Sequence, residues 1–151
     1  MWARLLRFKA LPSPAKALFL RALFLLPVLT CSLRFRGFGS TQKSLQNLLP
    51  TLRTPASGPT AKSCVELTSR MVLAAAHHSP FPSTCLERSL ALWWLLARQG
   101  ISAQFRIGVR KDAAKFQAHA WVENDGAAIG EPDGSHLHYA AFAEEFSGEL
   151  P

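Results

Sequence analysis

A thiol, an imidazole and a carboxylate, the groups that cooperate in cysteine-dependent catalysis, occur in the C-terminal half of this 151-residue sequence. A cysteine nucleophile needs a base within hydrogen-bond reach and a third group that orients the base. Cys85 is the candidate nucleophile, His119 the candidate base and Glu131 the candidate orienting group. The alternative for Cys85 is that it only fills space in the core, as many buried cysteines do.

The residues around Cys85 predict that its thiol lies at the start of a helix. Thr84 and Glu87 stand in the T-x-x-E relation of a capping box, and Gly100 supplies the stop. Cys85 is therefore expected on the first helical residue, where backbone N–H groups are unpaired and the helix dipole is positive. Both features favour the thiolate, which is the nucleophilic form of cysteine. The backbone N–H of Cys85 is the expected oxyanion donor.

Five histidines are candidates for the base. His119 is expected in the middle of a strand, between alanines that leave the imidazole accessible, and a structural role is its alternative. His77 and His78 are expected to cap the end of a helix. His136 and His138 are expected to be solvated in a polar loop. His119 is therefore the preferred base.

The three cysteines, Cys31, Cys64 and Cys85, are an odd number without a C-x-x-C pair. This pattern argues against a disulfide framework and a zinc cluster and favours a reducing compartment, so a cytoplasmic location is expected. Cys31 and Cys64 lie in apolar contexts and are expected to pack in the core. The sequence contains neither G-x-x-x-x-G-K-[ST] nor G-x-G-x-x-G, and no cofactor or metal is expected.

The hydrophobic pattern predicts helices in the first part of the chain and strands in the last part. Helices are expected at about 15–29 with a bend near Pro27, at 40–49, at 61–78 and at 85–100, with a linker at 50–59. Strands are expected at 103–109, 116–123 and 127–131, with a turn at 110–115, a hairpin loop at 124–126 and a short closing helix at 139–146. An α+β fold follows, with a basic helical region at 1–60 and a second domain at 61–151.

The net charge of +7 is concentrated in the N-terminal region. Residues 1–65 contain ten Lys or Arg and no acidic residue, whereas the remainder is mildly acidic. The basic region lacks interleaved aromatic residues or a reading motif, so no nucleic acid partner is expected. The uninterrupted apolar run at 22–31 is about half the length of a membrane span. This argues against a spanning helix and leaves shallow membrane contact as an alternative.

The third catalytic group depends on the register of the last hairpin. With 124–126 as a three-residue loop, His119 pairs with Glu131, and directly opposed residues share one face of the sheet. Asp133 then lies one diagonal step away and is the runner-up. A two-residue loop would instead pair His119 with Pro132 and turn Glu131 to the other face.

Four segments, in order, carry a resemblance to one family. They are 85–101 (CLERSLALWWLLARQGI), 105–109 (FRIGV), 118–123 (AHAWVE) and 129–132 (IGEP). Over about residues 60–135 the chain resembles the lasso-peptide biosynthesis B2 family. The resemblance implies a transglutaminase-like, papain-like cysteine protease core that hydrolyses a leader peptide from a ribosomally made precursor with a Cys/His/acid triad. The family more often has aspartate at the third place, where this chain has Glu131.

The same resemblance implies partners. The substrate would be a lasso precursor peptide, and the product would pass to an ATP-dependent macrolactam synthetase that resembles asparagine synthetases. Residues 1–60 are expected to be helical and to lack the strands of a fused leader-recognition domain, so a separate leader-recognition protein is expected. The alternative to an enzyme is a catalytically idle subunit that binds a leader or a partner through its basic region.

Overall fold

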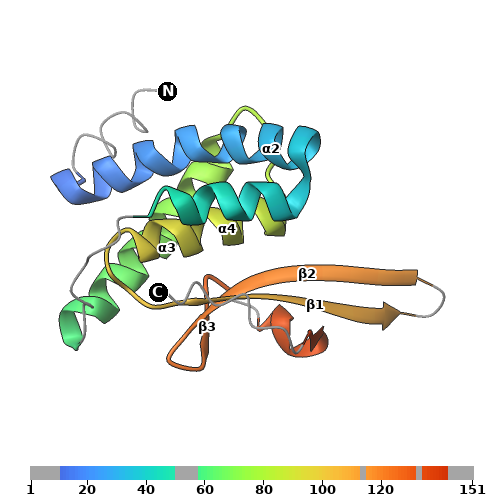
Figure 1. Cartoon of the computed structure of the whole chain (residues 1–151). Helices are drawn as coiled ribbons and strands as arrows, with labels where there is room; N and C mark the ends of the chain where they lie inside the picture. Colours follow the sequence, from blue (N-terminus) through green and yellow to red (C-terminus); the bar gives the residue numbers. More distant parts are fainter. Residues whose placement is uncertain (1–10, 50–57, 113–114, 132–133, 143–151) are drawn as a thin grey trace.

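The computed structural model describes residues 11–49, 58–112, 115–131 and 134–142, and it confirms the α+β fold. Within these residues three helices lie on one side of an antiparallel sheet (Figure 1). The helices are α2 (Ser13–Asn47), α3 (Pro59–His78) and α4 (Cys85–Ala97). The strands are β1 (Gln104–Asp112), β2 (Lys115–Asn124), β3 (Ala127–Ile129) and β4 (Ala140–Ala141), and a 3-10 helix, η1, covers Ser135–His138.

α2 is a helical hairpin rather than one straight helix. Gly37 has φ 76° and ψ 175°, and the chain reverses there, so that the two arms run side by side in opposite directions (Figure 1). The hydroxyls of Ser32 and Thr41 lie 2.8 Å apart across the hairpin. The break therefore falls at Gly37 and not near Pro27, because a left-handed φ is open to glycine without strain. The first of the two predicted helices is longer than expected and continues almost to Gly37, whereas the second ends at Asn47, two residues before its predicted end.

α4 is the central helix of the core. Residues 90–93, which cover all sides of one helical turn, are buried, as expected of a helix that is surrounded by other elements. It begins with the predicted capping box, in which the Glu87 carboxylate accepts a hydrogen bond from the Thr84 N–H at 2.5 Å. The chain leaves the helix through Gly100, with φ 74°. The start and end of α4 predicted from sequence are thus confirmed to within three residues.

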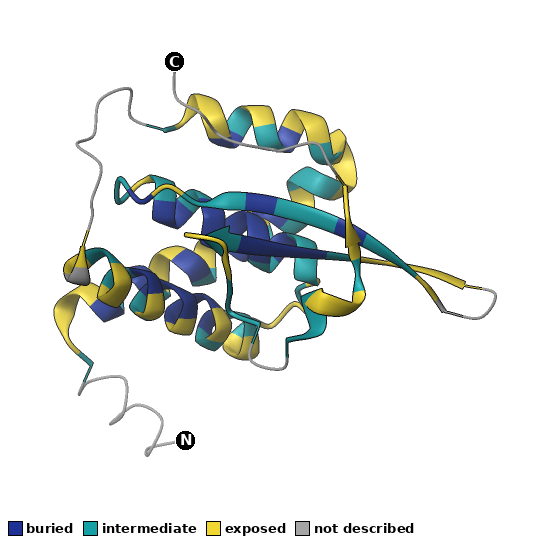
Figure 2. Cartoon of the chain, turned by 90° about the horizontal axis from the view of Figure 1, so that it is seen from below, coloured by how far each residue is buried: buried dark blue, intermediate teal, exposed yellow. Residues whose placement is uncertain are grey.

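The sheet has the strand order β3-β2-β1-β4, and each pair of neighbours is antiparallel. β1 and β2 pair along their whole length, which makes a longer hairpin than the predicted strands. Figure 2 shows this hairpin buried where it lies against the helices and exposed toward its far end. Ser89 on α4 donates a hydrogen bond to the buried Ala120 carbonyl at 2.8 Å, and this bond fixes α4 against β2.

The last hairpin has a two-residue loop, so the predicted three-residue register is wrong. Val122 pairs with Ile129, and the loop consists of Asp125 and Gly126. Both loop residues have positive φ, 50° and 76°, as a type I′ turn requires. The turn matches the right-handed twist of the flanking strands, which is why it prevails over a longer loop.

The closing helix predicted at 139–146 is also replaced. Tyr139 is extended, and Ala140–Ala141 form β4 against Gly108 and Val109 of β1. The short helical turn lies just before this segment, in η1. Residues 143–146 of the predicted helix lie outside the described residues.

Candidate active site

Cys85 occupies the first position of α4, as predicted. Thr84 before it is extended, with φ −79° and ψ 171°, so the chain enters the helix at the thiol. The Cys85 side chain is half-buried and lines a cavity of about 260 Å³. The thiol therefore meets the cavity at the positive end of the α4 dipole.

The other two thiols do not line this cavity. Cys64 on α3 is half-buried against the hydrophobic core, as predicted. Cys31 on α2 is exposed, so the prediction that it packs in the core is wrong. The first arm of α2 has apolar residues on two opposite sides, and Cys31 lies on the side that faces away from the core.

His119 lies on β2 opposite Gly108 of β1 and lines the same cavity as Cys85. Its imidazole stacks on Trp121 at a centroid distance of 6.1 Å and lies 5.1 Å from the Tyr139 ring. Gly108 leaves room for these rings, since a Cβ there would come within 2.9 Å of both Trp121 and the Ala140 carbonyl. The aromatic contacts therefore restrict the orientation of the imidazole.

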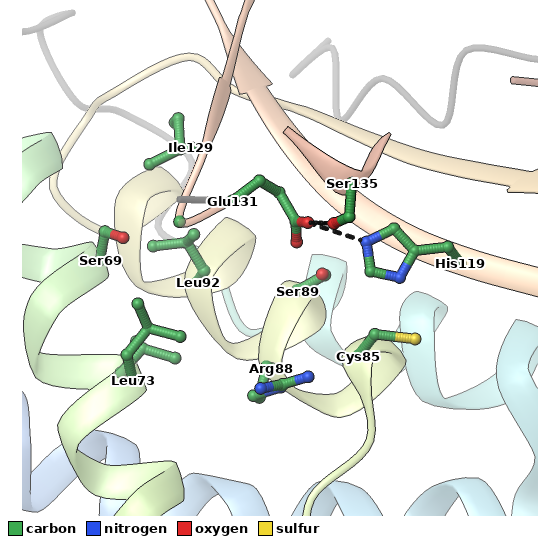
Figure 3. A pocket seen from close by; sticks show the side chains of 12 residues that line it. Ser69, Leu73, Cys85, Arg88, Ser89, Leu92, His119, Ile129, Glu131 and Ser135 are labelled. Carbon is green, nitrogen blue, oxygen red and sulfur yellow. Dashed lines mark hydrogen bonds and ion pairs between the residues drawn. The ribbon is translucent and has the colours of Figure 1, made fainter. Parts of the chain in front are cut away.

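Glu131 reaches His119, but not through the predicted strand pairing. Its Oε2 lies 3.0 Å from His119 Nε2, and only 15% of each side chain is exposed. A strand continued in the observed register would turn Glu131 to the opposite face of the sheet. The chain instead leaves the sheet after Ile129 and turns at Gly130, with φ 74°, which brings the carboxylate back toward the imidazole (Figure 3).

Ser135, which the sequence analysis did not identify, also binds this carboxylate. Its Oγ donates a hydrogen bond to Glu131 Oε2 at 2.5 Å, so that one oxygen accepts from both Ser135 and His119 (Figure 3). The one signal in the sequence is a hydroxyl four residues after Glu131. A hydroxyl at this spacing does not predict a contact with Glu131 unless the turn of the chain is known. Asp133, the runner-up for the third group, lies outside the described residues.

The contact with Glu131 determines which ring nitrogen of His119 can act as a base. A carboxylate only accepts hydrogen bonds, so the neutral imidazole carries its proton on Nε2. Nδ1 then has the lone pair, and Figure 3 shows this second nitrogen on the side of the ring turned toward Cys85. The three groups can therefore move a proton from the thiol to the imidazole, while the carboxylate stabilises the imidazolium.

The remaining four histidines do not line the cavity. His78 Nδ1 lies 2.8 Å from the Ala74 carbonyl and caps α3, as predicted, and His77 is exposed beside it. His138 is exposed as predicted, but His136 is half-buried, so its predicted solvation is wrong. In the described part of the chain no group of three or more His, Cys, Asp or Glu side chains is placed to hold a metal ion.

A second groove, of about 580 Å³, adjoins the cavity. Leu73 and Arg88 line both of them, and the groove continues between the end of α3 and the segment before α4. The Arg88 Nε donates a hydrogen bond to the Thr84 carbonyl at 3.3 Å. Among the described residues no carboxylate lies within ion-pair distance of Arg88. The site thus extends from the cavity at Cys85 into this groove, with the Arg88 guanidinium as a cation between them.

The comparison with known proteins is consistent with this geometry. A family model described as the transglutaminase-like superfamily matches residues 25–144, a segment that contains Cys85, His119 and Glu131. That superfamily includes cysteine peptidases and transglutaminases. No curated protein and no solved structure matches the chain.

Proposed function

The chain belongs to the transglutaminase-like superfamily, and from this premise we propose that it is a cysteine peptidase that removes the leader peptide from a ribosomally made lasso-peptide precursor. The proposal is carried by the convergence of three elements on one cavity. Cys85 comes from α4, His119 from β2 and Glu131 from the turn after β3, and His119 and Glu131 are hydrogen-bonded. This is the arrangement that an activated thiol nucleophile requires.

The proposed reaction forms and breaks a thioester. Cys85 Sγ attacks the carbonyl carbon of the scissile peptide bond while His119 Nδ1 accepts the thiol proton. The Cys85 N–H stabilises the oxyanion, because the first N–H groups of a helix have no partner within it. The C–N bond then breaks, and His119 gives the proton to the leaving amine of the core peptide. A water molecule, deprotonated by His119, hydrolyses the thioester, which releases the leader with a carboxylate end and restores the thiol.

The groove next to the cavity supports a peptide substrate. An extended peptide rises by about 3.3 Å per residue, so a segment that covers both hollows would place several residues beside the scissile bond. Leu73 and Arg88 lie where the two hollows meet, and they offer one apolar and one cationic contact. A small-molecule substrate would leave the second groove without a role.

The finer assignment to lasso-peptide maturation rests on the resemblance of segments 85–101, 105–109, 118–123 and 129–132 to that family of leader peptidases. It brings two proposed partners, a separate leader-recognition protein and an ATP-dependent macrolactam synthetase that resembles asparagine synthetases. The proposed site of action is the cytoplasm, where a ribosomal precursor is made. No cofactor takes part in the proposed reaction.

The test incubates the purified full-length protein with a lasso precursor and the leader-recognition protein in water enriched in oxygen-18. The products are read by mass spectrometry, and Cys85→Ala is the matched control. Hydrolysis predicts a leader that carries one heavy oxygen at its new C-terminus, and no cleavage by Cys85→Ala. The heavy oxygen separates hydrolysis from transfer of the acyl group to an amine.

Two results would overturn the proposal. The first is binding of the precursor without cleavage, with equal affinity for the wild type and Cys85→Ala, which is the behaviour of a catalytically idle binding subunit. The second is a product in which an amine, rather than water, has been joined to the acyl group, which is the behaviour of a transglutaminase.

A further inference from the structure

The outer face of the first arm of α2 is apolar and exposed. Leu20, Phe24, Val28 and Phe35 expose 43%, 73%, 61% and 81% of their surface, and Cys31 between them is exposed as well. These positions are three or four residues apart, so they form one row along the helix. At 1.5 Å per residue the row is about 22 Å long. Packing in the core does not explain two phenylalanines that are this exposed, and an exposed apolar patch of this kind usually marks an interaction site.

The opposite face of the same arm is fully engaged in the core. It consists of Ala15, Leu18, Ala22, Leu26 and Leu29, each of which is at most 7% exposed. Among the described helices α2 is the one that is long and apolar enough, by length and composition alone, to cross a membrane. Crossing would strip this inner face from α3 and α4 and open the core. The packing therefore favours a helix that lies on the surface of the molecule and presents one apolar side outward.

Cations flank the exposed row on both sides. At 100° per residue, Arg21 lies along one edge of the row, and Lys16 and Arg34 lie along the other. Residues 1–65 contain no acidic residue that would repel an anionic partner. A row of Leu, Phe and Val between long cationic side chains is the pattern of helices that lie in the interface of an anionic membrane.

The row also borders a shallow groove of about 430 Å³ between α2 and the end of α4. Phe24 and Val28 form one wall, and Trp94 lies at the other, with the Arg98 guanidinium 4.8 Å from the centre of its ring. Aromatic rings and arginines are the side chains that membrane interfaces favour, because each combines an apolar body with a polar end. The groove thus extends the apolar face onto α4 and adds a further cation at its rim.

We propose that this face of α2 binds the surface of an anionic lipid bilayer without crossing it. The aromatic side chains would enter the boundary between headgroups and acyl chains, and the flanking cations would reach the phosphates. A convex apolar row with cations on both sides and no acidic residue fits an anionic surface that is uniform along the helix. A protein groove fits it less well, because a groove would require particular side chains at particular positions along the row. The binding is independent of the peptidase chemistry, since the face contains none of the active-site residues.

The test is flotation of the full-length protein with vesicles of phosphatidylcholine alone or with one quarter phosphatidylglycerol. The expected result is binding to the anionic vesicles that is at least about ten-fold tighter than to the neutral ones and that weakens as salt is raised. The double variant Phe24→Ser, Phe35→Ser should lose at least about ten-fold in affinity. The matched control is Phe116→Ser, since Phe116 is 76% exposed but lies on β2. It should bind as the wild type does.

A third variant addresses the charges. Arg21→Gln with Arg34→Gln should remove most of the preference for anionic vesicles and leave the residual binding to neutral ones. Thermal melting of each variant identifies any that has lost its fold, and exposed positions are expected to melt within a few degrees of the wild type.

Three outcomes would overturn the proposal. The first is absence of vesicle binding, and the second is equal loss in the α2 variants and in Phe116→Ser. If the first outcome is accompanied by a concentration-dependent dimer that the double variant Phe24→Ser, Phe35→Ser abolishes, the face would be assigned to a second copy of the chain. The third is protein that stays with the vesicles after washing at high salt and high pH, which would indicate a spanning helix.

Discussion

At the scale of single residues, His119 connects the carboxylate to the thiol side of the cavity. Its Nε2 lies 3.0 Å from Glu131, whose same oxygen also accepts a hydrogen bond from Ser135. A carboxylate oxygen with two donors is held in place, and it in turn selects the tautomer of the imidazole. In the proposed mechanism the reactivity of Cys85 would therefore depend on Glu131 and Ser135, which lie 46 and 50 positions further along the chain.

Alkylation by iodoacetamide should reveal the activated thiol. Cys85 is half-buried and Cys31 is exposed, so accessibility alone would make Cys31 the faster of the two. Cys85 lies at the start of α4 and lines the same cavity as the His119 imidazole, and we expect it to react first at neutral pH. Peptide mass spectrometry over a time course gives the three rates. Fastest labelling of Cys31, with Cys85 as slow as Cys64, would contradict an activated nucleophile.

Substitution of Cys85 separates the same residue's chemistry from its packing. Cys85→Ala should abolish leader cleavage and leave the melting temperature close to that of the wild type, because alanine is tolerated at a helix start. Cys31→Ser and Cys64→Ser should retain cleavage, and only the latter puts a hydroxyl near the core. Loss of cleavage in well-folded Cys64→Ser, with cleavage retained in Cys85→Ala, would show that Cys64 and not Cys85 is the nucleophile.

Glu131 and Ser135 are expected to contribute to catalysis in different ways. Glu131→Ala should lower kcat by at least about 100-fold, since the imidazole loses its orienting and stabilising partner. Ser135 is a positioning residue, and Ser135→Ala should lower kcat by about ten-fold with little change in KM. Ser135→Thr, which keeps the hydroxyl, should recover most of that loss. Steady-state kinetics on a leader-derived peptide measures both constants.

The opposite pattern would show that Asp133 is the third group. Near-native turnover of Glu131→Ala together with an inactive Asp133→Ala would reject Glu131. An equal rise of KM in Ser135→Ala and Ser135→Thr, with kcat unchanged, would assign Ser135 to substrate binding instead.

At the scale of elements, a glycine turn carries Glu131 into the site. Gly130 has φ 74°, and a Cβ there would lie 3.0 Å from Ser69 Oγ on α3. β3 is only three residues long, so the turn, and not the strand, determines the direction of the carboxylate. The position of Glu131, the proposed third catalytic group, therefore depends on the contact between this turn and α3.

Replacement of Gly130 by alanine should disrupt catalysis more than stability. A left-handed φ costs a non-glycine residue about 1–2 kcal/mol, and the contact with Ser69 adds to this strain. We expect Gly130→Ala to lower kcat and to increase the exposure of Glu131. The comparison is Gly39→Ala in α2, where the added Cβ would meet none of the described residues apart from its own helix backbone and chain neighbours within 4 Å. It should leave kcat unchanged and raise the unfolding free energy by about 0.5–1 kcal/mol.

Kinetics and denaturant unfolding of the two glycine variants complete this test. If Gly130→Ala has native kcat, the turn can deliver Glu131 in another backbone conformation. The proposed dependence of the carboxylate on Gly130 would then be wrong.

At the scale of the whole molecule, α2 belongs to the same core as the elements that carry the proposed catalytic groups. Leu26 and Leu29 are 1% exposed, and they share one cluster of buried side chains with Leu90 of α4 and Phe105 of β1. The basic N-terminal region is therefore not merely an arm attached to the catalytic part. The inner side of α2 packs against α4, and its outer side is exposed.

The two sides of α2 should respond to mutation very differently. Leu26→Ala should lower the unfolding free energy by about 2–5 kcal/mol, the usual cost of a cavity in a packed core. Phe24→Ala, on a side chain that is 73% exposed, should stay within about 0.5 kcal/mol of the wild type. Urea unfolding followed by circular dichroism measures both. Equal destabilisation by the two variants would mean that the outer side is also packed.

Features that depend on a few neighbouring residues could be predicted from the sequence alone. The capping box of Thr84 and Glu87 places Cys85 on the first helical residue, because its signals lie within four positions. The strand predicted at 116–123, with His119 in its middle, is confirmed as part of β2. These two local predictions were enough to nominate Cys85 and His119, which line the same cavity.

Other features were decided by the tertiary structure. The sequence predicted the contact between Glu131 and His119 through a register that is wrong, and the turn at Gly130 restores it by packing against Ser69. The position of Ser135 depends on the same turn. Cys31 could not be placed because both sides of its helix are apolar, and only α3 and α4 select which side is buried. Contacts between residues distant in the chain depend on turns and packing, and a local hydrophobic pattern does not specify them.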